Sequence, residues 1–391
     1  MHVLMPWQNC ITGTSKNPAW VNRSFLLIIL LFLPWFVFSY GSLEPFNFPS
    51  ARAAALGGHH VAAGDDFYSL FSNPASLRSV EEQFSIAALS LSVHGPVFEL
   101  LDLFFEKHDD FDISGIIGKR GFAAGIDLGG PLAAGWVGRG KGIGLFNRTM
   151  INARVSGTRI RPVASEDFLL VGGYSHRVMD KNSHILDAGF LAKGFARGEI
   201  SLDASIFSAA NAFDDFWSSP FRTTLGLGVD LGVRYAYKNG LALALVYHDA
   251  YSPALTTHYE TFQRFRDGNS ISKSYSTLRP RLDAGISYTL KGIVLEKYIS
   301  QMVFMADYFD IMDYQNTLSR NPLLNIGIGA EIRLLDALDL RFGIGDALPA
   351  VGIGLNLTFM RLEFGFRGRE LGKDPGIQPV YSLELDFIFR Y

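Results

Sequence analysis

Residues 225–237 read LGLGVDLGVRYAY, and every second residue is large and apolar. The positions between them hold glycine, alanine, Asp230 and Arg234. Side chains alternate between the two faces of a β-strand, so one face here is oily and the other is small or charged. Asn239-Gly240 follows, a dipeptide typical of tight hairpins, and the alternation then resumes. The run is long for a globular strand and suits a tilted strand that crosses a bilayer.

The same alternation recurs down the chain. Buried strands of a soluble α/β protein would be apolar on both faces, whereas these strands are apolar on one face only. The repeated pattern predicts an all-β fold, a transmembrane antiparallel β-barrel of about 14 strands counted from Gly121. Other clear examples are residues 282–290, 324–334 and 351–359.

The early strands are the least certain part of that count. Residues 84–94 also alternate, and adding them would make the number of strands odd, although such barrels have an even number. The short pair 121–129 and 131–139 is split by Gly129-Gly130-Pro131. One of these early segments is therefore either a misreading or not a wall strand.

Composition agrees with a barrel in lipid. The 391 residues carry a net charge of −3, are 48% hydrophobic and only 19% charged, and include 40 glycines and 32 phenylalanines. Ordinary soluble domains are about a quarter charged. Phenylalanine suits the aromatic girdles of a barrel, and the charge balance gives no reason to expect a nucleic-acid partner.

The first 41 residues are predicted to be a signal peptide. Lys16 and Arg23 precede an apolar run, residues 24–38 (SFLLIILLFLPWFVF), which is short for a spanning helix. The small residues Ser39, Gly41 and Ser42 suit cleavage near 39–42; an uncleaved anchor helix is the alternative. Cys10 is the sole cysteine and precedes the run, so the mature chain would contain no disulfide and no cysteine metal site. These features predict export to the cell outer membrane.

Two further patterns support that location. The predicted connections are long on one side of the sheet, notably 196–221 and 251–274, and short on the other, as in 238–240. Long external loops and short periplasmic turns are typical of outer-membrane barrels. The chain ends in a strand, 381–391, whose apolar face finishes at Tyr391. This ending resembles the signal read by the outer-membrane insertion machinery, an expected partner together with outer-membrane lipids.

Residues 51–77 read ARAAALGGHHVAAGDDFYSLFSNPASL. This stretch resembles the start of the outer-membrane long-chain fatty-acid and hydrocarbon transporter family, which has small residues, a Gly-Gly, an Ala-rich step, an acidic pair and an Asn-Pro-Ala turn in that order. Residues 142–148 (GIGLFNR) and the ending LELDFIFRY are also similar, and the pattern points to a spirochaetal branch of the family. His59-His60 and Ser76 depart from the family pattern.

The resemblance implies three regions: a signal peptide (1–41), an N-terminal hatch or plug (42–83) that folds inward, and the barrel (84–391). A surface helix-turn is the alternative for the hatch. Glycines permit unusual backbone angles, an asparagine can cap a helix, and proline is tolerated at its first position. The acidic pair is expected to bind lumen arginines such as Arg234 or Arg333. The expected gating residues are Gly57, Gly58, Asp65, Asp66, Asn73 and Pro74.

The predicted function is therefore a transporter that passes hydrophobic small molecules such as long-chain fatty acids through a hatch-gated lumen. Aromatic residues in the 196–221 connection are expected to offer the ligand a first contact, although they could equally pack on one another or rest on lipid. We expect no cofactor, no metal and no catalytic residues. The aromatic residues are Phe207, Phe213, Phe216 and Trp217.

Other motifs give weaker signals. His59-His60 lacks a third metal ligand at fixed spacing, and residues 125–130 (GIDLGG) lack the lysine of a phosphate loop. One rival function is a structural or adhesin-like barrel whose external loops bind other molecules. The other is a lipid-modifying enzyme that uses His248, for which no nucleophile motif is evident.

Overall fold

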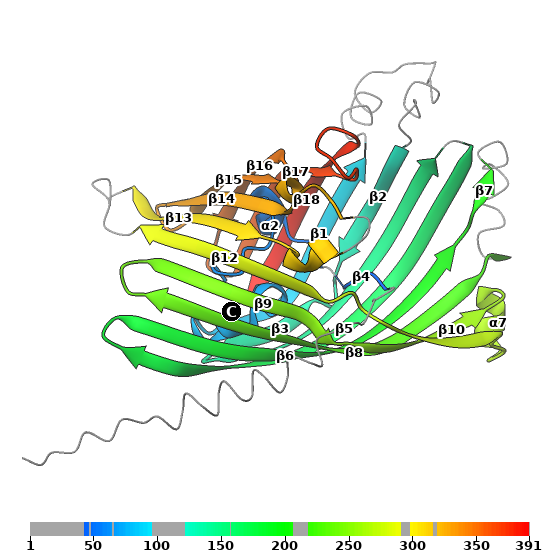
Figure 1. Ribbon diagram of the computed structural model, residues 1–391, viewed down its shortest axis with the longest axis horizontal. Coiled ribbons are helices and arrows are strands. Elements are labelled where there is room, and N and C mark those ends of the chain that lie inside the picture. The colour runs from blue at the N-terminus through cyan, green and yellow to red at the C-terminus, as the bar shows by residue number, and fades with distance from the viewer. Residues whose placement is uncertain are drawn as a thin grey trace, which may run out of the picture. The chain divides into compact units, whose positions relative to one another are not determined.

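A closed β-barrel dominates the chain (Figure 1). The computed structural model describes residues 43–46, 48–64, 66–95, 122–156, 158–205, 218–290, 298–315 and 319–390. Within these residues, eighteen β-segments form one sheet, which closes where β18 pairs with β1 to give a fourteen-strand antiparallel barrel. The predicted fold class is confirmed. The predicted signal peptide lies outside the described residues.

The eighteen segments are arranged in chain order around the barrel. Their bounds are β1 (Gln83–Gly95), β2 (Phe122–Gly129), β3 (Ala134–Gly138), β4 (Lys141–Ser156), β5 (Arg159–Lys181), β6 (His184–Ser201), β7 (Ala204–Ser205), β8 (Phe221–Tyr237), β9 (Leu241–Tyr251), β10 (Pro253–Tyr259), β11 (Ser272–Thr277), β12 (Arg281–Leu290), β13 (Ile299–Tyr308), β14 (Ile326–Leu334), β15 (Leu338–Gly345), β16 (Leu348–Asn356), β17 (Met360–Glu370) and β18 (Pro379–Arg390).

Several segments share one position in the wall, which resolves the uncertain strand count. β2 and β3 both pair with β1 on one side and with β4 on the other, so together they are one interrupted strand. β9 and β10 divide another strand, as do β11 and β12, and β7 continues β6 along the edge of β5. Residues 84–94 are a true wall strand. Treating 121–129 and 131–139 as two strands was wrong, because the interruption at Gly129-Gly130-Pro131 does not reverse the chain.

The external connections are shorter than the sequence indicated. β6 continues to Ser201 and β8 begins at Phe221, so the described strands cover both ends of the predicted 196–221 connection. Most of the predicted loop 251–274 is a hairpin of β10 and β11 that carries the short helix α7 (Phe262–Arg266). These two strands are rich in serine and threonine, so the sequence shows no apolar alternation there. Their main chains nevertheless pair as a ladder.

The two faces of the wall have the predicted characters. In β8 the side chains of Leu225 and Leu227 are 60% and 63% exposed on the outside, whereas Asp230 is 3% exposed on the inside. Exposed leucine, isoleucine, valine and phenylalanine recur on the outer face of most strands. A closed barrel with such an outer surface is a transmembrane β-barrel of the outer-membrane type. Among the described residues, no helix is long and apolar enough to cross a bilayer.

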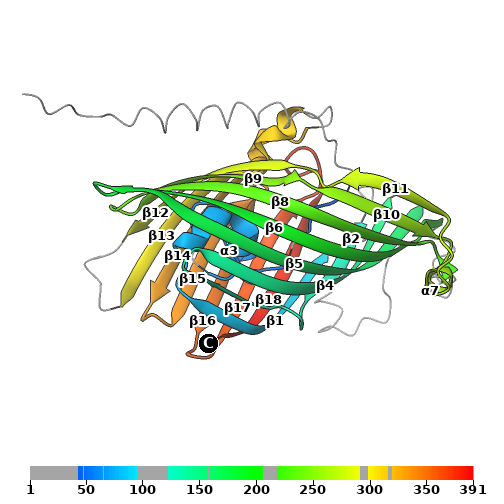
Figure 2. The ribbon, with the colours of Figure 1, turned by 90° about the horizontal axis from the view of Figure 1, so that it is seen from below.

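The described residues from Leu43 to Glu82, called the inner segment below, lie within the ring of strands (Figures 1 and 2). Helix α2 (Ala51–Ala55) contacts β15 to β18, while the 3₁₀ helix η2 (Pro74–Arg78) contacts β5, β6 and β8 on another part of the wall. The short helix α3 (Ser69–Ser72) packs between η2 and β4. Leu43 forms an isolated bridge with Leu278, between β11 and β12.

The described residues also contain two short 3₁₀ helices on the connection between β13 and β14. They are η5 (Ile311–Gln315) and η6 (Pro322–Asn325). Asn321 caps η6 by accepting from the main-chain N–H of Leu323, and proline follows at the first position of the helix.

Candidate functional site: the filled lumen

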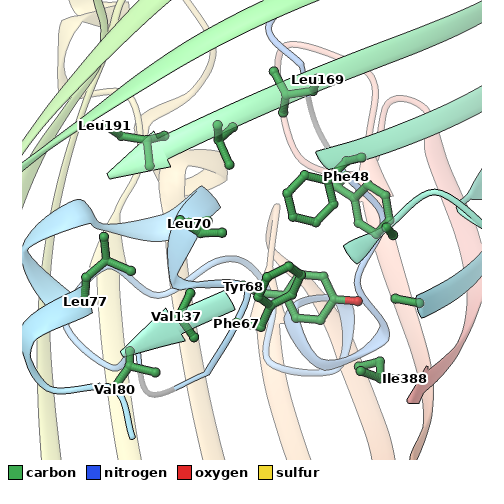
Figure 3. Close-up of a cluster of buried hydrophobic side chains, with 14 residues drawn as sticks. Phe48, Phe67, Tyr68, Leu70, Leu77, Val80, Val137, Leu169, Leu191 and Ile388 are labelled. Atoms are coloured by element: carbon green, nitrogen blue, oxygen red, sulfur yellow. The ribbon is translucent and has the colours of Figure 1, made fainter. Parts of the chain in front are cut away.

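An apolar cluster joins the inner segment to one side of the lumen (Figure 3). Phe48, Phe67 and Leu70 of the inner segment meet inward-facing wall residues such as Leu169 and Leu191. The rings of Phe48 and Phe146 are edge-on, with centroids 5.2 Å apart. Barrel interiors are normally polar, so an apolar strip on the inner face of β4 to β6 is a distinct feature of this lumen. Its wall members are Phe146, Leu169, Val171 and Leu191, with Phe195 packed beside them.

The opposite side of the lumen is charged. Arg52, in α2, donates from Nε to Glu331 Oε2 at 2.9 Å and from Nη1 to Asp66 Oδ2 at 2.8 Å. Glu331 lies on β14 and also accepts from Arg341 Nε at 2.7 Å. Arg341 is fully buried and binds the Glu363 carboxylate as well, at 3.1 Å. Buried charges persist only when they are paired, and this network pairs the inner segment with the wall of β14 to β17.

Asp66 is one of the predicted gating residues. It pairs with Arg52 and, at 3.5 Å, with Arg361, a lumen arginine of β17. Burial alone would raise the pKa of Asp66, but the two arginines hold the pKa below its ordinary value. The sequence pattern could not tell which of Arg234, Arg333 and Arg361 lies beside Asp66. All three point inward from wall strands, and they differ in their height in the barrel. Asp65 lies outside the described residues.

Arg234 also holds the inner segment, through hydrogen bonds to two oxygen atoms. It donates from Nε to the main-chain oxygen of Ala62 at 3.1 Å and from Nη1 to Ser79 Oγ at 3.0 Å. Ser287 of β12 donates to the same Ala62 oxygen at 3.2 Å. Main-chain carbonyls are strong acceptors with two lone pairs, so two strands secure one peptide group of the inner segment.

The two adjacent histidines differ in role. His60 is buried, and its Nδ1 contacts the Asp307 carboxylate of β13, which also accepts from the main-chain N–H of Val61 at 2.9 Å. His59 is partly buried near Arg367 and Arg281; burial and then these cations lower its pKa to about 3. His59 is therefore neutral at physiological pH. Among the described residues, no group of three histidine, cysteine or acidic side chains is arranged to hold a metal.

The predicted glycine pair touches the wall. Gly57 has φ of +80°, and a Cβ there would lie 2.5 Å from the main-chain oxygen of Ile344 in β15. At Gly58 a Cβ would lie 2.6 Å from the ring of Phe309. Both the backbone angle and the close approach exclude other residues at Gly57, since a side chain there would collide with the main chain of the wall.

Asn73 and Pro74 form the turn that the sequence indicated. Asn73 is fully buried; its Oδ1 accepts from the N–H of Ala75 at 2.9 Å and caps η2, whose first residue is Pro74. Its Nδ2 also donates to the Val61 oxygen at 2.8 Å, which ties the turn to an earlier part of the inner segment. The turn abuts Gly189 and Gly232, where a Cβ would lie within 2.6 Å of Pro74 or Asn73 atoms.

A cavity of about 40 Å³ lies beside Arg52, Leu56, His59, Asp66 and Tyr68 of the inner segment. One water needs roughly 10–15 Å³ by this measure, so this cavity has room for a few waters and not for a hydrophobic ligand of any length.

A second buried charged cluster lies on β6, β8, β9 and β12. Lys193 Nζ lies 2.7 Å from Asp230 Oδ1 and 2.6 Å from Asp249 Oδ1. His248 faces inward, with its ring nitrogens 3.5 Å from carboxylate oxygens of Asp230 and Asp283. Both neighbours of this histidine are carboxylates, the pairing expected of a structural ion cluster in a polar lumen.

Four predicted site residues remain untested, and two features of the lumen were not predicted. Phe207, Phe213, Phe216 and Trp217 lie outside the described residues. Sequence reasoning did not single out Arg52, although it is the only arginine in an otherwise apolar five-residue helix, a signal that would have marked it. It also missed the inner-face apolar strip, because single apolar residues at inward positions resemble irregularities in the alternation.

No known family model and no characterised protein sequence matches the chain. Among solved structures, it is similar to the CymD monoaromatic hydrocarbon channel, with 11% identity over 88% of this chain and 98% of that one and a TM-score of 0.44. The P. putida toluene transporter TodX gives 11% identity over 89% and 98%, with a TM-score of 0.41. A Pseudomonas aeruginosa FadL homologue gives 11% over 88% and 98%, also at 0.41. At such scores the likeness carries no information on ligand or mechanism, and none of the three supports placement in a spirochaetal branch.

Proposed function

We propose that this barrel passes hydrophobic small molecules, such as long-chain fatty acids, across the outer membrane through a lumen that the inner segment closes. The observation that carries the proposal is the apolar strip on the inner face of β4 to β6. A pore for hydrophilic solutes gains nothing from an apolar inner wall, whereas an apolar ligand needs one. The order of motifs in residues 51–77 supports the same assignment.

Passage requires the inner segment to leave the strip. The contacts of Phe48, Phe67 and Leu70 with the strip are hydrophobic, and an apolar ligand supplies equivalent contacts when it replaces them. Gly57, Gly58, Asp66, Asn73 and Pro74 then act as the residues that set where the segment bends and where it stays attached. Asp65 and the aromatic residues of the 196–221 connection keep their proposed roles in gating and first contact.

The test is uptake of a fluorescent long-chain fatty acid into liposomes that contain the purified barrel. Leu169→Gln and Val171→Thr make the strip polar without touching the charged side of the lumen. We expect uptake to fall at least tenfold in the double variant. Ala330→Thr, on the outer face of β14, is the matched control and should leave uptake unchanged. Unchanged uptake in the double variant would remove the basis of the proposal.

Deletion of residues 51–77 tests the closing role separately. If the inner segment closes the lumen, its removal admits small hydrophilic solutes such as sugars, which the intact barrel excludes. Equal fatty-acid uptake and equal sugar exclusion with and without these residues would defeat the gating role while leaving the barrel itself intact.

The rival of a surface-interaction barrel rests on one specific observation. Helix α7, between β10 and β11, packs its Phe265 on Phe221 at the start of β8, with ring centroids 4.9 Å apart. A rigid external projection of this kind suits recognition of another molecule. Deleting residues 260–271, the tip of the hairpin, leaves fatty-acid uptake intact if the barrel is a transporter and abolishes ligand-independent surface binding if it is an adhesin.

A further inference from the structure

The outer face of the barrel has a hollow along β6. Four successive outward positions of this strand are small: Ala192, Gly194, Ala196 and Gly198. The partners on both sides at the middle two positions are large. Leu170 of β5 and Leu227 of β8 flank Gly194, and Phe168 and Leu225 flank Ala196. We call this hollow the β6 trench.

A cavity of about 590 Å³ lies on the lipid side over the middle of the β6 trench, at Gly194 and Ala196. It also reaches Leu145 of β4 and Leu255 of β10. A Cβ added at Gly194 would meet only one atom within 4 Å, the Cδ2 of Leu227 at 3.8 Å. Large, exposed side chains therefore flank an open space above Gly194 on the membrane-facing side of the wall.

The rows of large side chains on β5 and β8 favour a single extended chain. They stand on strands roughly 10 Å apart, with β6 between them. A packed α-helix is about 10–12 Å across with its side chains and would not enter between these rows. Water is disfavoured because the lining is apolar. The medium at this face is hydrocarbon, so an acyl chain is the occupant that fits.

A carboxylate marks one end of the trench. Glu166 pairs with Gly198 across β5 and β6 and shares the outward face of the wall with Phe168. It accepts from Asn147 Nδ2 at 3.0 Å and from the Thr149 hydroxyl on the outward side of β4. A carboxylate attracts a headgroup that carries N–H or O–H donors, and it repels another carboxylate.

We propose that the β6 trench binds one acyl chain of an amine-bearing bilayer lipid, with the headgroup at Glu166 and the tail directed toward Ala192. The site is separate from the lumen and does not depend on the proposed transport function. The charge at Glu166 distinguishes a membrane lipid from a free fatty acid, whose carboxylate would meet like charge there.

Native mass spectrometry of the full-length mature protein in mild detergent tests the proposal. The probes are phosphatidylethanolamine and, separately, palmitate. We expect the wild type to retain one phosphatidylethanolamine per barrel and Gly194→Phe, which fills the trench, to lose at least tenfold in occupancy. Glu166→Gln should weaken retention several-fold. Ala330→Phe is the matched control, since it adds the same ring on the outer face of β14 between Phe304 and Phe342.

Heat-modifiable migration on gels confirms that each variant is folded, and Ala196→Leu replaces Gly194→Phe if the larger ring prevents folding. Equal retention by the filled and wild-type proteins, or loss of lipid in the Ala330→Phe control as large as in the filled variant, would overturn the proposal. Retention of palmitate in preference to phosphatidylethanolamine would overturn the assignment of the occupant.

Discussion

Replacing Arg52 by methionine should release the inner segment from the charged side of the lumen without unfolding the barrel. Arg52 is the cation that α2 presents to the wall, and its guanidinium bridges Glu331 and Asp66. Methionine keeps most of the side-chain volume and removes the charge. Both carboxylates retain another arginine, because Glu331 still pairs with Arg341 and Asp66 with Arg361.

The expected cost follows from those contacts. Arg52 makes charge-assisted hydrogen bonds at 2.8, 2.9 and 3.2 Å. Removing one partner of a buried ion pair costs about 3–5 kcal/mol when the other charge is left alone. Since neither carboxylate is left alone, the loss should be near the lower figure, about 3 kcal/mol, which corresponds to about a 100-fold larger population of the displaced inner segment.

Hydrogen exchange of the inner-segment amides measures this population directly. The N–H groups of Ala54 and Leu56 are bonded within α2 and should exchange about 100-fold faster in the variant, while wall amides exchange as before. The matched control is Arg139→Met, which breaks an exposed pair with Glu82 at 2.9 Å and should change exchange little. Unchanged exchange of the α2 amides, or an equal rise in exchange of the wall amides, would refute this role of Arg52.

Three further predictions concern the inner segment. The pKa of His59 is about 3 when the segment is in place, against the ordinary 6.5, so between these pH values His59 gains a proton only when the segment is displaced. Acidification from pH 7 to 5 should therefore raise exchange of the segment about 25-fold after correction for intrinsic rates, and His59→Gln should abolish this dependence. Gly57→Ala should lower the midpoint of heat modification far more than Gly376→Ala, since both have φ near +80° but only Gly57 faces main chain within 2.5 Å. Asn73→Ala removes a buried cap and a second hydrogen bond, which should cost about 2 kcal/mol and make the segment sensitive to protease.

The sequence predicted the wall well because a barrel strand repeats one simple rule. Large residues at 225 and 227 and charge at 230 and 234 could be assigned to opposite faces without any knowledge of neighbouring strands. The same rule failed where the chain continued through an interruption. Gly129-Gly130-Pro131 has the composition of a turn, yet β3 continues beside β1 in the direction of β2, a fact that depends on long-range pairing.

Partners inside the lumen could not be predicted for a different reason. Period-two alternation identifies which arginines point inward, but their heights depend on the stagger between strands, which no single strand encodes. Arg234 and Arg361 are equivalent by pattern, and only the register of β8 and β17 separates them. The capping turn at Asn73 was predictable because it is local: the cap and its acceptors lie within a few residues.

The two sides of the lumen hold the inner segment by different forces, and this difference bears on how a hydrophobic ligand would open it. On the side of β14 to β17, ion pairs such as Arg52 with Glu331 need a partner of opposite charge, which an apolar ligand does not carry. On the side of β4 to β6, Phe48 and Phe67 make only apolar contacts, which any hydrocarbon of similar area replaces at little cost. A hydrophobic ligand therefore competes for one side and leaves the other attached. Under the proposed function the segment swings about its charged side, and a polar solute, which gains nothing from the apolar strip, does not open the lumen.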